Sequence, residues 1–257
     1  MSSPPVEEST PDAGESGARM GFLEHLDELR RRITWAAAAV MVGFVVAWVF
    51  SDRLLAFLLD PIQEAMGQLT VIRPAEAFMN KMKAALLGGI FLALPMILYQ
   101  AWSFVAPGLY PRERRWIVPV ISAGSLLFAA GAAFSYYVAV PTAAKFLAEQ
   151  GTGYQSHITV DSAFSFASKL LLGLGLVFEM PLLALALARF GIVSARGLWK
   201  QLDKAIFAIF VLAAILTPTP DMMTMTIFAL PMIALYLLSI GVAWLVQPRA
   251  PKGSEAK

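Results

Sequence analysis

Residues 116–144 read WIVPVISAGSLLFAAGAAFSYYVAVPTAA and include no Asp, Glu, Lys or Arg. A transmembrane helix needs about 20 predominantly apolar residues to cross the hydrocarbon core of a bilayer. This run is 29 residues long. It therefore predicts a membrane-spanning helix near the middle of the chain.

Similar charge-poor runs occupy most of the remaining sequence. They comprise residues 33–51, 84–105, 170–188, 205–220 and 222–248, in which Glu179 is the one charged side chain. The run at 205–220 ends in Thr-Pro-Thr-Pro, which favours a turn over a helix. We therefore expect a short span, a tight turn and a further span in this region. The predicted fold is an all-α membrane protein, with six transmembrane helices in a single domain at residues 21–248.

The overall composition agrees with this class and excludes several others. Of the 257 residues, 58% are hydrophobic and 15% are charged, whereas soluble domains carry about 25% charged residues. The chain has no Cys, and its two His residues are His25 and His157. The sequence therefore lacks the residues for thiol catalysis and for a Cys- or His-based metal site, and we expect no cofactor. A net charge of +2 is too small to indicate nucleic-acid binding.

Prolines recur inside the predicted spans. A transmembrane helix tolerates proline because neighbouring groups can pair with the carbonyl that the ring leaves free. We therefore expect kinked helices and curved packing at Pro95, Pro119, Pro141, Pro181 and Pro231.

The distribution of Lys and Arg predicts the orientation in the membrane. With the N-terminus inside, 14 basic residues fall on the inner side and six on the outer side. Inner loops of membrane proteins carry an excess of Lys and Arg, so both termini are expected to be cytoplasmic. The first outer segment, which carries four of the six outer basic residues, fits this rule least well. Residues 1–20 and 249–257 are rich in polar residues, Pro and Gly, and we expect disordered cytoplasmic tails there.

The two longer outer loops are open to two interpretations. Residues 54–59 favour a short interfacial helix that Asp60-Pro61 would end, and Asp161 or Ser162 could cap the fourth span. The loops could form an ordered cap over the outer end of the bundle or serve only as connectors.

Two acidic residues on the predicted inner face are candidates for binding a partner. Each also has a purely structural interpretation. Glu28 lies in an amphipathic segment where it can pair with Arg32, as Asp27 can with Arg31, so this segment could be a locally neutralised interfacial helix. Glu113 lies among Arg112, Arg114 and Arg115. That loop could anchor to anionic lipid, or it could hold a carboxylate ready for a cationic partner.

Four blocks of residues together resemble one known family. In chain order they are HLDELRRR at 25–32, YQAWSFVAPGLY at 99–110 followed by ERR at 113–115, FEMP at 178–181 and LTPTPD at 216–221. They resemble the TatC family, the large multi-spanning subunit of the twin-arginine protein translocase, and the resemblance covers about residues 21–247. It implies a protein of the bacterial cytoplasmic membrane that receives folded cargo through signal peptides with paired arginines, without enzymatic activity.

The resemblance also implies roles for particular residues. The signal-peptide site would comprise Glu28, Glu113, Leu26, Arg30, Phe104, Pro107, Leu109, Tyr110 and Arg114. Single-span TatA-like and TatB-like partners would dock along the fifth and sixth spans, at Thr217, Asp221, Thr224 and Met225. Met225 departs from the Gln-containing patch of some relatives. The family further implies self-association in a larger complex and transport driven by the proton-motive force.

Glu179 supports the main alternative. It lies near the middle of its span, where a lipid-facing acid is costly, so it must face the bundle, a wet groove or a partner. It could make a structural hydrogen bond or a functional polar contact. In a secondary transporter of a small solute or ion it would be the proton site, but that class favours internal repeats, and the sequence shows no convincing one. An intramembrane hydrolase is excluded, because the predicted spans contain none of the paired catalytic residues that such an enzyme needs.

Overall fold

The computed structural model describes residues 13–105, 117–151, 157–189, 191–217 and 221–246. Within these ranges the protein is a bundle of helices with a single isolated β-bridge. In chain order the elements are α1 (Ala13–Trp48), α2 (Ser51–Met66), α3 (Glu76–Val105), α4 (Ile117–Phe134), the π-helical segment η3 (Ser135–Ala139), α5 (Val140–Gln150), α6 (Val160–Phe178), α7 (Met180–Arg189), α8 (Ala195–Lys200), α9 (Leu202–Leu216) and α10 (Met222–Val246).

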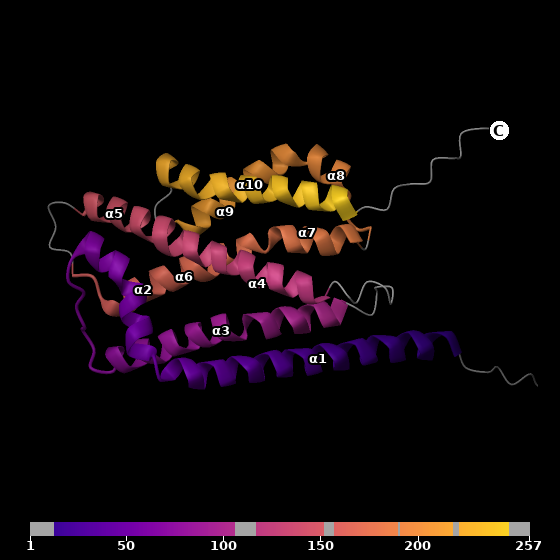
Figure 1. Ribbon diagram of the computed structural model, residues 1–257, viewed down its shortest axis with the longest axis horizontal. Helices are drawn as coiled ribbons and strands as arrows, with labels where there is room; N and C mark the ends of the chain where they lie inside the picture. The colour runs from indigo at the N-terminus through magenta and orange to yellow at the C-terminus, as the bar shows by residue number, and fades with distance from the viewer. Residues whose placement is uncertain (1–12, 106–116, 152–156, 190, 218–220, 247–257) are drawn as a thin grey trace, which may run out of the picture.

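The long helices run back and forth between two ends of the bundle (Figure 1). α2, the start of α3 and the start of α6 lie at the left-hand end of the view. The start of α1, α8 and the end of α10 lie at the right-hand end, so the described chain begins and finishes at the same end. Following the orientation predicted from the sequence, we name the left-hand end the outer end and the right-hand end the inner end.

Five helical segments are long and apolar enough to cross a membrane within the described ranges. They are Glu24–Trp48, Glu76–Phe104, Val118–Gln150, Val160–Arg189 and Met222–Val246. The predicted fifth span corresponds to α9, which has 15 residues and is not among them. At a rise of 1.5 Å per residue it is about 22 Å long, against about 30 Å for the hydrocarbon core. The five long apolar helices make this a helical, multi-pass membrane protein over its described residues.

The buried core centres on α6 and α10. Leu170 and Leu174 of α6 and Phe228 and Met232 of α10 are almost completely shielded. α1 contributes little to this core, because it lies at the edge of the bundle against α3 (Figure 1). The two helices approach closely at a glycine pair, where a Cβ placed on Gly43 would lie only 2.6 Å from the carbonyl oxygen of Gly89.

Proline distorts some helices and leaves others continuous. The N–H of Val140 bonds to the carbonyl of Ser135, five residues back, just before Pro141. A single π-helical turn of this kind is a known source of bending in long helices. α6 and α7 are separated at Glu179, two residues before Pro181. The predicted kinks at Pro95 and Pro231 lie inside helices that remain unbroken.

Several predicted boundaries differ from the structure. α1 begins at Ala13, within the predicted disordered tail. α2 does not end at Asp60-Pro61, because it continues through the buried Pro61 to Met66, next to Gly67 with a positive φ of 83°. α3 begins at Glu76, within the segment predicted to be an outer loop.

Candidate functional site

Glu28, the first predicted ligand of the signal peptide, has an arginine partner at the inner end. Arg32 Nη2 donates to Glu28 Oε1 over 3.0 Å, and Arg32 Nη1 donates to Gln100 Oε1 of α3 over 3.2 Å. The side chains of Glu28 and Arg32 are 24% and 22% exposed. The predicted Glu28–Arg32 pair is confirmed, so Glu28 is neutralised locally while it keeps access to solvent.

The predicted Asp27–Arg31 pair is wrong. Both side chains are exposed, and no ion pair joins them in the described part of the chain. An exposed pair of this kind gains only a few tenths of a kcal/mol on a helix surface, and Asp27 and Arg31 do not form it.

An aromatic contact joins α1 to α3 close to this pair. The rings of His25 and Phe104 stack with centroids 4.4 Å apart and planes 24° apart. Leu26 and Arg30, which follow His25 on α1, are exposed. The segment of α1 that carries the candidates Leu26, Glu28 and Arg30 therefore contacts the end of α3 that carries Phe104, through His25 and Arg32. The sequence alone did not indicate this contact of His25.

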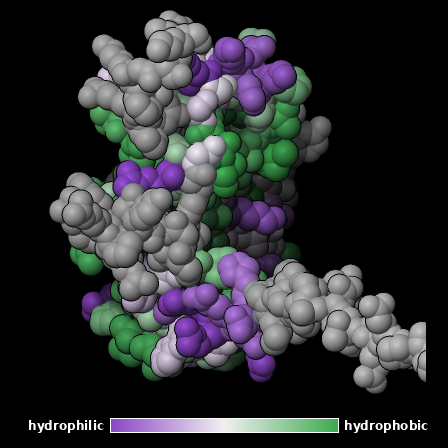
Figure 2. All heavy atoms as spheres, turned by 90° about the vertical axis from the view of Figure 1, so that its right-hand side faces the viewer, coloured by the Kyte–Doolittle hydropathy of each residue, from purple (hydrophilic) through white to green (hydrophobic). Residues whose placement is uncertain are grey.

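The remaining signal-peptide candidates are Pro107, Leu109, Tyr110, Glu113 and Arg114, and they lie outside the described residues. Figure 2 looks onto the inner end, with hydrophilic side chains gathered at its bottom and at its top. α1 and α3 lie at the bottom in Figure 1, and α8 lies at the top.

Glu179 lies between α6 and α7 with its side chain inside the bundle. Its exposed fraction is 7%, and neither carboxyl oxygen has a hydrogen-bond partner among the described residues. The alternative of a structural hydrogen bond is therefore not observed there. Oε2 lies 3.1 Å from the position that a Cβ would take on Gly124 of α4. The carboxyl group thus reaches across to α4, where a glycine leaves room for it.

The backbone around Glu179 remains paired despite the break. Its N–H donates to the carbonyl of Leu176 over 3.1 Å, and its own carbonyl accepts from the N–H groups of Leu182 and Leu183 over 3.0 Å each. Pro181 has no N–H to donate to the carbonyl four residues before it, that of Val177, so the regular helical pairing is interrupted here. The break therefore places an acidic side chain in the bundle while the N–H and carbonyl of Glu179 itself stay paired.

The predicted partner-binding residues lie around the start of α10, at the outer end. Thr217 and Thr224 are buried, and Thr217 Oγ1 donates to the carbonyl of Ala213 over 2.9 Å. Asp221 Oδ2 accepts the N–H of Thr224 over 2.8 Å, which caps the helix. This hydrogen bond holds the pKa of Asp221 below its ordinary value. Met225 is partly buried. The two threonines thus face the protein interior.

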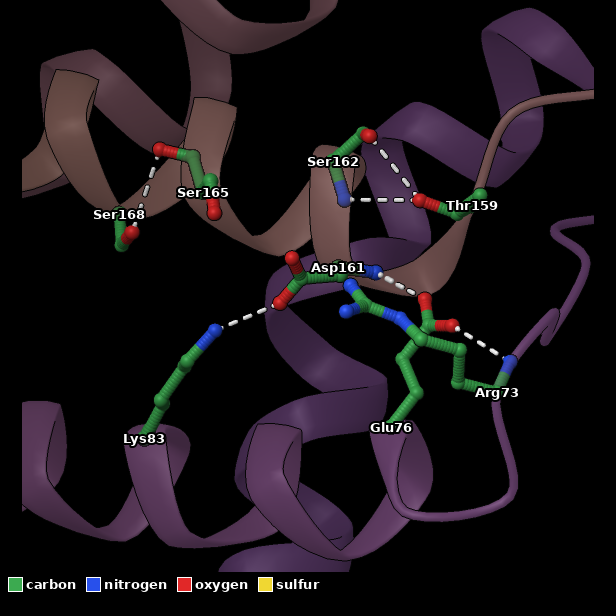
Figure 3. Close-up of polar contacts among 8 residues, drawn as sticks. All are labelled: Arg73, Glu76, Lys83, Thr159, Asp161, Ser162, Ser165 and Ser168. Atoms are coloured by element: carbon green, nitrogen blue, oxygen red, sulfur yellow. Dashed lines mark hydrogen bonds and ion pairs between the residues drawn. The ribbon is translucent and has the colours of Figure 1, made fainter.

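The outer end contains a polar cluster that the sequence did not indicate (Figure 3). Glu76, at the start of α3, is 6% exposed. Its Oε1 accepts the N–H of Asp161 over 3.0 Å, and its Oε2 accepts the N–H groups of Ile72 and Arg73 over 3.2 and 3.3 Å. Lys83 Nζ lies 2.6 Å from Asp161 Oδ1. One buried carboxylate therefore ties the first outer loop to the start of α6.

Backbone pairing reinforces this connection. Thr70 and Thr159 form a parallel β-bridge, in which Thr70 N–H donates to the carbonyl of Ile158 over 2.9 Å and Val160 N–H donates to the carbonyl of Thr70 over 3.1 Å. The cap of α6 is Thr159, whose hydroxyl accepts the N–H of Ser162 over 3.1 Å, and not the predicted Asp161 or Ser162. Of the two interpretations of the outer loops, the ordered cap is the one observed in the described residues.

Comparisons with known proteins agree on one family. The family model of the Sec-independent protein translocase protein (TatC) matches residues 24–231. TatC of Koribacter versatilis is 45% identical over 236 residues, covering 90% of this chain and 87% of the relative, and TatC of Carboxydothermus hydrogenoformans is 39% identical over 235 residues, covering 91% and 97%.

A solved structure matches the same family. The crystal structure of the twin-arginine translocase receptor TatC in DDM superimposes with a TM-score of 0.75 at 33% sequence identity, covering 85% of this chain and 99% of that chain. A family model that spans most of the sequence, relatives of similar length and a matching fold lead to one conclusion. The chain belongs to the TatC family of Sec-independent protein translocase proteins.

Proposed function

We propose that this protein is the receptor subunit of a twin-arginine translocase in the bacterial cytoplasmic membrane. It would bind the paired arginines of signal peptides on folded cargo and assemble with single-span partners for export driven by the proton-motive force. The observation that carries the proposal is the state of Glu28, a partly exposed carboxylate at the inner end whose present partner is itself a guanidinium.

The orientation is part of the proposal. The described part of the chain begins and finishes at the same end of the bundle (Figure 1), which supports an even number of crossings. Five segments satisfy the length and hydropathy criteria, and α9, which runs between the two ends, would be the sixth. The larger share of Lys and Arg belongs to the end where the chain starts and finishes, so both termini would be cytoplasmic.

Binding would proceed by exchange of one guanidinium for another. Arg32 has two acceptors, Glu28 and the buried Gln100. A signal-peptide arginine can therefore replace Arg32 at Glu28 while Gln100 continues to hold Arg32. Arginine suits this exchange because its planar fork can bond both oxygens of a carboxylate, whereas lysine presents a point charge.

The second arginine would be received by Glu113. Phe104 would support the segment that follows α3, because its ring is already stacked on His25 of α1. Pro107, Leu109 and Tyr110 would shape that segment, and Arg114 would tune its charge. Leu26 and Arg30, which are exposed on α1, would border the peptide.

The TatA-like and TatB-like partners would lie along α9 and α10. Both helices present large apolar side chains outward, among them Phe207, Ile215 and Leu230. Because α9 is short, a partner span beside it would cover part of the mismatch with the bilayer. Met225 and Asp221 would border this surface, while the buried Thr217 and Thr224 would hold its backbone in place. Self-association in a larger complex belongs to the same proposal.

Glu179 would make a polar contact with cargo or with a partner span inside the bundle. Its two carboxyl oxygens have no donor among the described residues, and burying a polar group without a hydrogen bond is costly. In the alternative, a secondary transporter, the same carboxyl group would carry a proton. The two functions are separated by what the protein binds at its inner end.

The proposal is tested by measuring peptide affinity on the purified protein. A twin-arginine signal peptide should bind more tightly than its twin-lysine variant, and Glu28→Gln should remove most of that difference. Equal affinity for the two peptides would contradict the receptor function and leave the transporter as the better interpretation.

A further inference from the structure

A second surface of interest lies at the inner end, far from Glu28. α8 and the last part of α10 border an open groove with a volume of about 440 Å³. Its floor is apolar, with Ile240 and Gly241 of α10, and its rim carries Arg196, Trp199 and Lys200 of α8 and Trp244 of α10. The signal-peptide and partner sites described above include none of these residues.

Fixed contacts hold the groove in shape. Tyr236 of α10 donates its hydroxyl to the carbonyl of Leu198 of α8 over 2.9 Å. The hydroxyl of Ser194 accepts the N–H of Gly197 over 3.0 Å and so fixes the first turn of α8. Below this turn, Ala195 packs with Ala188 and Ala243 in a small buried cluster. α8 is therefore docked on α10, and the groove is a built feature of the fold.

The rim combines two kinds of side chain that favour a membrane interface. Trp199 and Trp244 are 61% and 68% exposed, and tryptophan is enriched where a bilayer meets water. Arg196 and Lys200 are exposed, and neither forms an ion pair with another described residue. Asp203 is the one acid between residues 189 and 204, against four basic residues. The local charge is therefore positive.

We propose that this groove binds an anionic phospholipid of the cytoplasmic leaflet. One acyl chain would lie over Ile240 and Gly241 between the two tryptophans, and the phosphate would lie at Arg196 and Lys200. Basic pockets between transmembrane helices on the cytoplasmic side are suited to acidic head groups. The charge selects an anionic lipid over a partner helix, because an apolar helix would leave two cations unpaired. The leaflet follows from the proposed orientation, but the binding itself does not depend on it.

The tryptophans supply the measurement. The full-length protein is placed in nanodiscs that contain a phospholipid with brominated acyl chains, which quench nearby tryptophan fluorescence. Brominated phosphatidylglycerol should quench more strongly than brominated phosphatidylcholine at the same mole fraction. The excess should disappear in the Trp199→Phe/Trp244→Phe variant, which locates the signal in the groove.

Two variants test the charge and the shape separately. Arg196→Gln/Lys200→Gln should raise the fraction of anionic lipid needed for half-maximal quenching by roughly tenfold to thirtyfold. Lys145→Gln/Lys169→Gln removes the same net charge from exposed residues elsewhere and should leave it unchanged. Gly241→Phe should fill the groove without a clash, because a Cβ at Gly241 would meet nothing within 4 Å, and it should abolish the excess.

Several results would overturn the assignment. Equal quenching by the two lipids, or an excess that survives both Arg196→Gln/Lys200→Gln and Gly241→Phe, would show that no specific lipid occupies the groove. An excess that appears only after residues 247–257 are deleted, or only when a single-span partner is absent, would assign the groove to a protein segment.

Discussion

The two ends of the bundle are built on different principles. At the outer end, buried Glu76 accepts three backbone N–H groups, and the Thr70–Thr159 bridge joins loops that lie far apart in the sequence. At the inner end, Glu28 is bonded to a side chain of its own helix and remains partly exposed. A carboxylate bonded to backbone has no equivalent partner to exchange for, whereas one bonded to an arginine can accept another arginine. The outer end is suited to hold the fold, and the inner end to receive a ligand.

The largest effect is expected on peptide affinity, from a substitution of Glu28 at the inner end. Glu28→Gln removes the charge that a signal-peptide arginine would meet, so peptide affinity should fall about tenfold to a hundredfold. Thermal stability in detergent should change little, because Arg32 keeps its bond to Gln100. Asp27→Asn, which removes an exposed and unpaired acid one residue away, is the control. An affinity that falls equally in both variants would show that bulk charge, and not Glu28, attracts the peptide.

The middle of the bundle sharpens the comparison, because Glu179 is buried like Glu76 but has no described partner. Glu179→Ala should abolish most export in cells while the protein still inserts into the membrane. Glu179→Gln should retain most export if hydrogen bonding is what the site supplies. Export assays with matched membrane levels measure both. Full export by Glu179→Ala would remove Glu179 from the functional site.

Breaking the outer end should affect stability more than binding. Glu76→Ala leaves three N–H groups without their acceptor, so the melting temperature in detergent should fall by on the order of 5 °C. Peptide affinity should stay within roughly twofold of the parent value, because distant sites are nearly independent. Glu64→Ala, at an exposed acid of α2, is the matched control. An unchanged melting temperature would mean that the outer cluster does not hold the fold.

The smallest effect concerns the depth of α9. With 15 residues, this helix is about 22 Å long, so it cannot span about 30 Å of hydrocarbon without local thinning of the bilayer or cover from a partner. Spin labels at Leu202 and Leu216 should therefore report bilayer depths that differ by less than those of labels at the two ends of α10. Equal depth differences for the two helices would contradict this expectation.

Composition and charge spacing predicted much of this architecture. They indicated the helical membrane class, the positions of the long spans and the short helix at α9, because apolar length is a property of the local sequence. They did not predict that α2 continues past Pro61, since burial of that proline depends on distant residues. Glu76 was overlooked for a similar reason: one of its three backbone partners, the N–H of Asp161, is 85 residues away, and its burial depends on that contact. Spacing within one helix suggested the Glu28–Arg32 pair, but the same spacing wrongly suggested Asp27–Arg31. What distinguishes Arg32 is its second bond to Gln100 of α3, which spacing does not reveal.

The central claim is that paired arginines are received at the inner end while the outer end holds the fold. Photoreactive side chains placed singly at His25 and at Ser162 can be compared on the same protein with a twin-arginine signal peptide. We expect the peptide to crosslink from position 25, to lose that crosslink when its arginines are changed to lysines, and not to crosslink from position 162. Crosslinking of equal strength from both positions, or from position 25 regardless of the arginines, would contradict the account.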